Sequence, residues 1–286
     1  MAIALVTGTG SGIGLATAVT LARGGHTVIA TMRNLDGAVE LRQIVSAEKL
    51  PVTVTALNVD DDASVSNAVG KVLADNGRID VLVNNAGMGG RGSVEEVPTA
   101  VFRQIMETNF FGALRCIKAV IPGMRERRYG CIVNVTSVAG RVALAPQAPY
   151  AASKWAFEAL SECLAQEMKA FNVRVAIIEP GVIATSIFGK ATPLPEGSPY
   201  PHSRRLQALF DAALTKPTSP YVVGEQIRQI VEGNSWQLRY PVGPDAAPFL
   251  KWRASLTDEE VVNQAGGSDA EYKARVKQLY GLDLKL

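Results

Sequence analysis

Tyr150 and Lys154 are the residues of this chain whose types and spacing are best suited to proton transfer. Side chains four residues apart on a helix lie one turn apart on the same face, so the Lys ammonium would lie beside the phenol. A neighbouring positive charge favours phenolate, so the pKa of Tyr150 is predicted to fall. Ser137, arriving from the end of a neighbouring strand, could hold a substrate oxygen against the phenol. The spacing alone is equally typical of a solvent-exposed helix face, so the rest of the chain must decide between the two.

The overall composition indicates a globular protein with a large core. The 286 residues fit one α/β domain, 47% of them are hydrophobic, and the net charge is only +2. The most basic cluster, 125–128, is short and contains an acid, so we expect no nucleic-acid partner. No apolar run approaches the length that a membrane span requires.

Cysteine and histidine usage points to a cytoplasmic protein without a metal site. Cys116, Cys131 and Cys163 are widely spaced in apolar segments, so they are predicted to be reduced core residues. His26 and His202 are the two histidines of the sequence, so few histidine side chains are available for a zinc site or a His-dependent triad. The N-terminal residues form an apolar strand without the charged leader of a signal peptide.

Strands and helices are predicted to alternate through most of the chain. This alternation indicates α/β architecture: a single-domain Rossmann-type doubly wound parallel sheet of about seven strands, over residues 1–286. Gly112 and Pro122 are expected to interrupt the longest helical region. The predicted strands are 3–7, 26–31, 52–57, 79–83, 130–136, 173–179 and 236–240, and the predicted helices are 15–23, 36–48, 61–76, 98–128, 149–171, 204–214 and 224–233.

Residues 183–220 depart from this alternation because prolines punctuate a polar stretch. A long excursion at the carboxyl edge of a parallel sheet usually covers a site, so we interpret 183–220 as a substrate lid inserted before the last helix and strand. A surface loop is the alternative. Residues 243–286 form a C-terminal extension of irregular and helical character, whose role the sequence does not indicate.

A glycine-rich loop follows the first predicted strand directly. Gly8, Gly12 and Gly14 stand between that strand and the next helix, in the pattern Thr-Gly-x-x-x-Gly-x-Gly. Glycines at this point let the backbone approach a pyrophosphate, which the helix N-terminus then stabilises. A tight turn without a ligand is the alternative, but the flanking strand and helix favour a dinucleotide site.

The end of the second predicted strand indicates which dinucleotide is bound. An acid at this corner binds the ribose 2′-hydroxyl of NAD, whereas an Arg accommodates the 2′-phosphate of NADP. The acid is absent here and Arg33 is present. A guanidinium can pair with a phosphate through two hydrogen bonds, so we expect a preference for NADP(H), with NAD(H) as the alternative.

Several motifs, taken together and in order, resemble the classical short-chain dehydrogenase/reductase family. The segment 30–34 and the C-terminal part look most like the branch of 17β-hydroxysteroid and retinol dehydrogenases. Asn58 departs from the family pattern, where Asp is common, and Thr9-Gly10 replaces the usual Ala-Ser. The motifs cover about residues 1–240 and are the glycine loop 7–14, Asn84-Asn85-Ala86-Gly87, Asn109, Ser137, Tyr150 with Lys154, and Pro180-Gly181.

The resemblance implies a role for each matching residue. Tyr150 would be the acid/base, while Lys154 would bind the nicotinamide ribose and lower the pKa of Tyr150. Ser137 would hold the substrate oxygen, and Asn109 would keep a water in a proton relay. The implied cofactor contacts are Gly8, Ser11, Gly12, Ile13, Gly14, Arg33, Asn58, Val59, Asn85, Ala86, Gly87, Tyr150, Lys154, Pro180, Gly181, Ile183 and Thr185.

The expected function is therefore an NADP(H)-dependent oxidoreductase that interconverts an alcohol and a ketone or aldehyde. Two alternatives stay open. One is dehydration or epimerisation of a nucleotide sugar, although such relatives are usually longer. The other is a dinucleotide-sensing regulator, a class that tends to lack the Tyr or Lys found here. The resemblance also implies a homodimer or homotetramer.

The substrate itself is predicted only as a class of small molecule. Arg91 or Arg141 could bind a carboxylate, and either is equally typical of an exposed position. The remaining candidate residues predict a mainly apolar site for a hydrophobic substrate; they are Met88, Gly89, Val138, Leu144, Gln147 and the lid residues Ile187 and Phe188.

Overall fold

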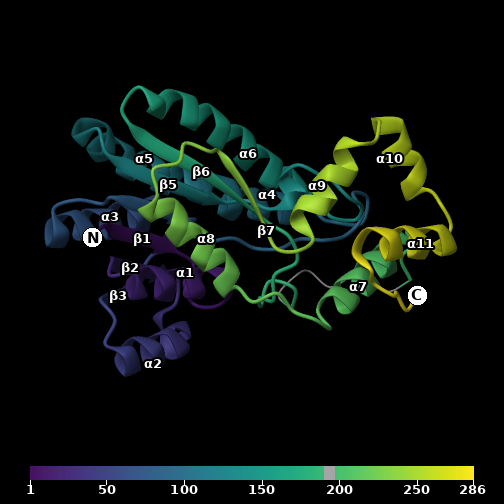
Figure 1. Ribbon diagram of the computed structural model, residues 1–286, viewed down its shortest axis with the longest axis horizontal. Helices are drawn as coiled ribbons and strands as arrows, with labels where there is room; N and C mark the ends of the chain where they lie inside the picture. The colour runs from purple at the N-terminus through teal and green to yellow at the C-terminus, as the bar shows by residue number, and fades with distance from the viewer. Residues whose placement is uncertain (190–196) are drawn as a thin grey trace.

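Seven parallel strands form one central sheet in the order β3-β2-β1-β4-β5-β6-β7 (Figure 1). The computed structural model describes residues 1–189 and 197–286. Every neighbouring pair of strands is parallel, so the predicted doubly wound sheet is confirmed. The strands are β1 (Ile3–Thr7), β2 (Thr27–Met32), β3 (Val52–Ala56), β4 (Val81–Asn84), β5 (Gly130–Val135), β6 (Val173–Pro180) and β7 (Arg239–Val242).

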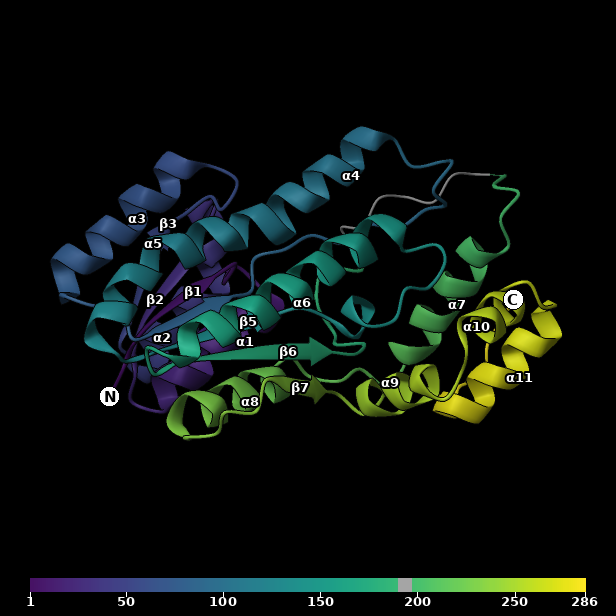
Figure 2. The ribbon, with the colours of Figure 1, turned by 90° about the horizontal axis from the view of Figure 1, so that it is seen from above.

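Helices cover both faces of the sheet (Figures 1 and 2). Successive side chains of a strand point to opposite faces, so in β1 Leu5 packs into one core layer and Val6 into the other. This burial on both sides explains why the strands read as nearly continuous apolar runs. One layer contains α1 (Gly12–Arg23), α2 (Val39–Glu48) and α8 (Tyr221–Glu232), and the other contains α3 (Asp62–Asn76), α5 (Gly112–Arg127) and α6 (Ala148–Lys169).

The long helix predicted for 98–128 is divided into α4 (Thr99–Met106), a wide π-helical turn at Glu107–Phe111, and α5. The break falls just before Gly112, whereas Pro122 lies inside α5. A Cβ atom on Gly112 would lie 2.8 Å from Cγ2 of Val59, so a larger residue would push α5 away from the loop after β3. Glycine is therefore required at this position for packing.

The last strand lies slightly later than predicted. β7 is Arg239–Val242 rather than 236–240, and its residue Pro241 pairs with β6. A proline lacks the N–H that a central strand would need, but β7 is the edge strand and tolerates it. Trp236 instead lies outside the strand, where its ring is 3.3 Å from the Lys169 ammonium.

The three cysteines are only partly as predicted. Cys116 and Cys131 are buried, but Cys163 is exposed, because it lies on the outer face of α6. Across the described ranges, none of the helices combines the length and the apolarity needed to cross a membrane.

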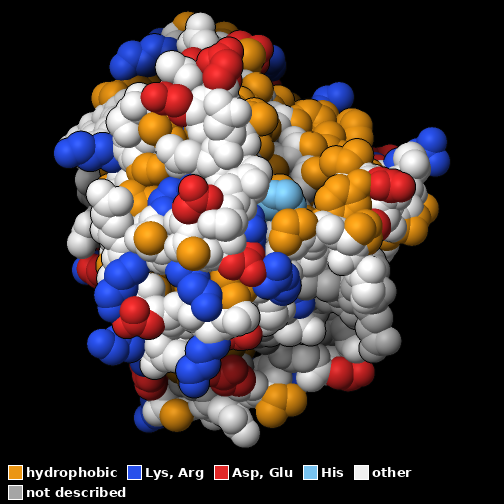
Figure 3. Space-filling view, turned by 90° about the vertical axis from the view of Figure 1, so that its right-hand side faces the viewer, with side chains coloured by type: hydrophobic (Ala, Val, Ile, Leu, Met, Phe, Trp, Pro, Cys, Tyr) orange, Lys and Arg blue, Asp and Glu red, His pale blue; other side chains and the backbone are white. Residues whose placement is uncertain are grey.

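Four helices gather at one end of the molecule, beyond the carboxyl ends of the strands (Figures 1 and 2). They are α7 (His202–Ala213), α9 (Ala246–Ala254), α10 (Asp258–Ala265) and α11 (Asp269–Tyr280). α7 belongs to the predicted lid, of which residues 190–196 lie outside the described residues. The helices α9 to α11 confirm the helical character predicted for the C-terminal extension. Figure 3 views this end, where apolar side chains gather on the surface between charged ones.

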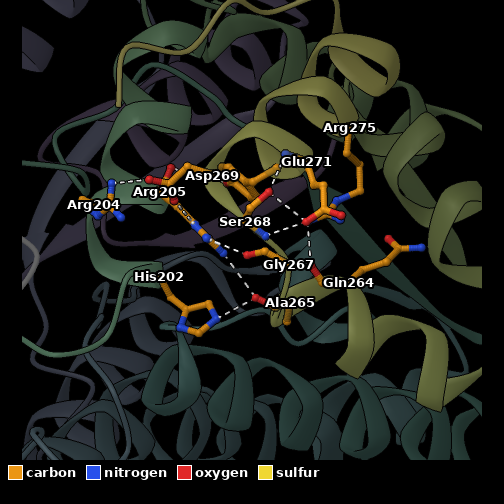
Figure 4. Close-up of polar contacts among 11 residues, drawn as sticks. His202, Arg204, Arg205, Gln264, Ala265, Gly267, Ser268, Asp269, Glu271 and Arg275 are labelled. Atoms are coloured by element: carbon orange, nitrogen blue, oxygen red, sulfur yellow. Dashed lines mark hydrogen bonds and ion pairs between the residues drawn. The ribbon is translucent and has the colours of Figure 1, made fainter.

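A buried arginine fixes the C-terminal helices to α7 (Figure 4). Arg205 is only 5% exposed and donates to the Asp269 carboxylate at 2.8 Å and to the Gly267 carbonyl at 2.7 Å. His202, one turn earlier on α7, contacts the Ala265 carbonyl at 3.1 Å. The loop between α10 and α11 therefore depends on donors that α7 supplies, and the lid and the extension form one unit.

Replacement of Arg205 tests this connection. Arg205→Met should lower the free energy of unfolding by about 2–3 kcal/mol, because buried carbonyl oxygens lose their donors. Hydrogen exchange should accelerate in α10 and α11. Arg204→Met is the matched control, since Arg204 contacts the same Asp269 but its side chain is 58% exposed. Equal destabilisation by the two substitutions, measured by urea unfolding, would contradict the proposed role of Arg205.

Candidate active site

A cleft of about 960 Å³ crosses the carboxyl ends of the strands from β3 to β6. Ligands of open α/β sheets bind at this edge. The cleft brings together all the predicted catalytic and cofactor residues except Gly14 and Asn109, which lie behind its wall. All the predicted substrate-site residues line it as well, apart from Arg141.

The glycine loop shapes one wall of the cleft. Gly8 and Gly12 have positive φ angles of 72° and 59°, which side chains other than glycine rarely adopt. Ser11 is the N-cap of α1, but its side chain makes no capping hydrogen bond, and the first turn contains no acid. The N-terminus of α1 therefore presents backbone donors and the positive end of the helix dipole to the cleft, an arrangement that fits a pyrophosphate.

Gly14 is required for the packing of α1 against the glycine loop. A Cβ atom at this position would lie 2.2 Å from the Gly8 carbonyl oxygen, so only glycine lets α1 approach the loop. Asn85 supports the same loop, since its amide nitrogen donates to the Thr7 carbonyl at 2.9 Å and the Gly8 carbonyl at 3.1 Å. The contact of Gly14 with the cofactor that the resemblance implies stays a prediction.

The adenosine end of the cleft contains Arg33, Asn58 and Val59. Arg33 is exposed, and within the described part of the chain no acid forms an ion pair with it. Asp60 also lines this end: its Oδ2 accepts a hydrogen bond from Thr108 at 3.1 Å, whereas its Oδ1 is buried without a partner among the described residues. An unpartnered acceptor here fits the amino group of an adenine. Asn58, which the resemblance implies as a cofactor contact, lines the same end of the cleft.

The catalytic candidates meet where α6 packs against the end of β5. Lys154 Nζ lies 5.7 Å from the centroid of the Tyr150 ring and donates to the Val135 carbonyl at 2.9 Å. Ser137 follows β5 and begins the 3-10 turn Val138–Gly140, where its hydroxyl accepts from the Ala139 amide at 3.1 Å. The same hydroxyl donates to the Pro180 carbonyl at 3.5 Å, and Tyr150 lines the same cleft. Tyr, Lys and Ser therefore converge as predicted.

The predicted effect of Lys154 on the phenol is wrong for this structure. Burial raises the pKa of Tyr150, and the hydrogen bond to Ser137 offsets this only in part. Burial also lowers the pKa of Lys154 to about 8, opposed by the negative charge of Glu158. Desolvation thus outweighs the charge of the neighbouring lysine, a balance that sequence spacing does not reveal.

Asn109 lies in the wide turn between α4 and α5, and its side chain is 1% exposed. Its amide donates to the Met88 carbonyl at 3.0 Å and to Ser153 Oγ at 2.9 Å, and its Oδ1 accepts from the Met88 amide at 2.8 Å. These bonds tie the loop after β4 to α6. The side chain is fully engaged in this contact, so any relay through Asn109 would use its backbone.

Described residues of the predicted lid and of the C-terminal extension give the cleft an apolar wall. Phe188 packs edge-on against Phe210 of α7, with ring centroids 4.9 Å apart. The sequence did not identify the contribution of the extension, because these residues belong to no motif. Added lining residues from α7, α9, α11 and the segment after α11 are Leu206, Leu209, Phe210, Phe249, Tyr280 and Leu282.

Asp245, just before α9, is a second functional candidate that the sequence did not reveal. Its Oδ2 accepts from the Val182 amide at 2.8 Å, and its Oδ1 is buried without a partner among the described residues. The carboxylate thus holds the loop that contains Ile183 and lines the end of the cleft near Pro180. An unpartnered acceptor at this end fits a carboxamide donor such as that of nicotinamide.

Of the two arginines considered for a carboxylate, only Arg91 lines the cleft. Its Nη1 donates to Gln207 of α7 at 2.6 Å. Arg141 instead pairs with the buried Glu179 at 3.3 Å, outside the cleft lining.

Comparison with known proteins agrees with this geometry. The family model for short chain dehydrogenases matches residues 2–194. The chain is 42% identical to retinol dehydrogenase 8 of Homo sapiens over 191 residues. This aligned region covers 65% of this chain and 60% of that protein. A solved short-chain dehydrogenase from Streptomyces avermitilis is 34% identical, with a TM-score of 0.80 over 93% of this chain and 99% of the other.

A second solved structure carries a cofactor. The actinorhodin polyketide ketoreductase with NADPH is 27% identical to this chain, with a TM-score of 0.71 over 84% of this chain and 95% of the other. The fold, the cleft and these similarities lead to one conclusion. The chain belongs to the short-chain dehydrogenase/reductase family of oxidoreductases, on the branch that contains retinol dehydrogenases.

Proposed function

We propose that this protein is an NADP(H)-dependent oxidoreductase that interconverts a hydrophobic alcohol and its ketone or aldehyde. The observation that carries the proposal is the convergence of Ser137, Tyr150 and Lys154 in a cleft that also contains the glycine loop and Arg33. A proton donor and a dinucleotide site in one cleft are the two parts that reduction of a carbonyl needs.

Each residue has a distinct task in this mechanism. Ser137 donates a hydrogen bond to the substrate oxygen and orients it toward the phenol. Tyr150 gives its proton to that oxygen during reduction and takes it back during oxidation. The raised pKa of Tyr150 keeps the phenol protonated at neutral pH, which suits the acid role. When bound, the nicotinamide supplies or accepts the hydride.

Lys154 and Asn109 act around this centre. Lys154 reaches the cleft with a charged ammonium, where it binds the hydroxyl groups of the nicotinamide ribose. Asn109 fixes the loop at Met88 to α6, and the wide turn around it leaves its backbone available to hold a relay water.

The cofactor preference follows from the corner after β2. Arg33 lies in the cleft lining without a carboxylate partner among the described residues, and a guanidinium there pairs with a 2′-phosphate. The NADPH carried by the ketoreductase of similar fold supports this assignment. An NAD(H)-using enzyme of the same fold is the alternative.

The apolar wall supports a hydrophobic substrate, because Phe188, Phe210 and Phe249 line the same cleft as Tyr150. Assembly as a homodimer or homotetramer and location in the cytoplasm stay predictions from the sequence. The dinucleotide-sensing regulator is the alternative function, distinguished by cofactor binding without turnover.

Removal of the phenolic hydroxyl tests the catalytic assignment. Tyr150→Phe should lower kcat by about 10²- to 10⁴-fold, the usual contribution of a general acid, while NADPH still binds. NADPH oxidation is followed by absorbance against a panel of hydrophobic aldehydes and ketones, and cofactor binding by fluorescence. Turnover that survives the substitution would refute the role of Tyr150. Binding of NADPH by the unaltered protein without turnover of any carbonyl would favour the regulator.

Replacement of Arg33 tests the cofactor preference. Arg33→Ala should weaken NADPH binding by about 10- to 100-fold, the value of a charged hydrogen-bonded contact, and leave NADH binding unchanged. Arg42→Ala is the control, because Arg42 is an exposed arginine of α2 outside the cleft lining. An equal loss of affinity for both dinucleotides, measured by titration calorimetry, would contradict the assignment of Arg33 to the 2′-phosphate.

A further inference from the structure

Two buried carboxylates lie behind the catalytic lysine, on the side away from the cleft. Glu158 follows Lys154 by one helical turn on α6 and is 4% exposed, and Glu179 at the end of β6 is 1% exposed. Neither lines the cleft. Buried acids are costly unless they are paired, so their position beside the site requires an explanation.

Three consecutive residues at the end of β5 connect this pair of acids to the site. The Val135 carbonyl accepts from Lys154 at 2.9 Å, and the Thr136 hydroxyl donates to Glu158 Oε1 at 2.6 Å. Ser137, the next residue, lines the cleft together with Tyr150 and Lys154. The contact of Thr136 with Glu158 therefore sets how the end of β5 lies against α6, and with it the place of Ser137.

Charged groups from several neighbouring elements surround Glu158 and Glu179. Arg239 of β7 contacts its Oε2 at 3.0 Å, contacts Glu162 of α6 at 2.7 Å and lies 3.7 Å from Glu179. Arg141, just after the 3-10 turn, pairs with Glu179 at 3.3 Å. Both arginines are partly exposed, whereas Lys154 is 5% exposed on the cleft side. Glu158 is thus the buried carboxylate that contacts both Arg239 and Thr136, the residue after the carbonyl that accepts from Lys154.

We propose that Glu158 is a positioning residue for the reaction, whose negative charge keeps the Lys154 ammonium protonated and whose contact with Thr136 holds Ser137 in place. The inference rests on the proposed function, because it assigns to Lys154 a charged role in binding the nicotinamide ribose. Glu158 itself would not touch a ligand, because it does not line the cleft.

The sign of the effect follows from the surroundings of Lys154. Burial lowers the pKa of this lysine to about 8, and the charge of Glu158 opposes that shift. Neutralising Glu158 removes the opposing charge, so the lysine pKa falls further and the ammonium is lost at a lower pH. The alkaline limb of the activity profile should therefore move toward lower pH.

The test is the pH profile of kcat/KM for NADPH-dependent carbonyl reduction in Glu158→Gln. Its alkaline limb should shift down by about one pH unit, the usual effect of a nearby opposite charge. NADPH affinity, measured by fluorescence, should weaken along the same pH range. Glu162→Gln is the matched control, because Glu162 shares the Arg239 contact but its side chain is 52% exposed, and its profile should match that of the unaltered protein.

The conservative variant separates charge from packing. Glu158→Asp keeps the charge and shortens the side chain, so it should retain the unaltered alkaline limb even where it is less stable. A uniform fall in rate at every pH for Glu158→Gln, or an equal shift in Glu162→Gln, would overturn the inference. Failure of the unaltered protein to reduce any carbonyl would instead refute the proposed function.

Discussion

Lys154 carries an ammonium into a buried position against the end of β5, and the arrangement of the site depends on how that charge is accommodated. The Val135 carbonyl accepts a hydrogen bond from it, and the ring of Tyr150 lies beside it. Burial costs the charged form enough to bring the lysine pKa to about 8. The lysine is therefore balanced between its two protonation states near physiological pH, and the groups around it decide which one prevails.

The lid and the C-terminal extension complete the site from the other side. Arg205 joins α7 to the loop before α11, so the apolar wall containing Phe210 and Phe249 is built on one connected unit. The proposed catalytic residues come from the end of β5 and from α6, within the segment that the family model matches. The proposed substrate wall comes largely from segments outside the shared motifs, a division that would let one chemistry serve different substrates within a family.

The sequence predicted those features that depend on local pattern. The alternation of strands and helices, the glycine loop and the spacing of Tyr150 and Lys154 are local, and the structure contains all three. The role of Asp245 and the exposure of Cys163 depend on long-range packing, which periodicity does not encode. The predicted direction of the shift in the Tyr150 pKa was wrong for the same reason, since desolvation depends on the whole surrounding fold.

Transfer of deuterium from NADPH labelled at nicotinamide C4 to a hydrophobic ketone tests the central claim most directly. The account predicts that only one of the two NADPH stereoisomers, each labelled at one of the two C4 hydrogens, delivers deuterium to the carbonyl carbon. The reason is that the cleft would hold the nicotinamide in one orientation beside Tyr150, and the deuterium in the product is detected by mass spectrometry. Binding of labelled NADPH without any deuterium in products, across the full panel of aldehydes and ketones, would contradict it.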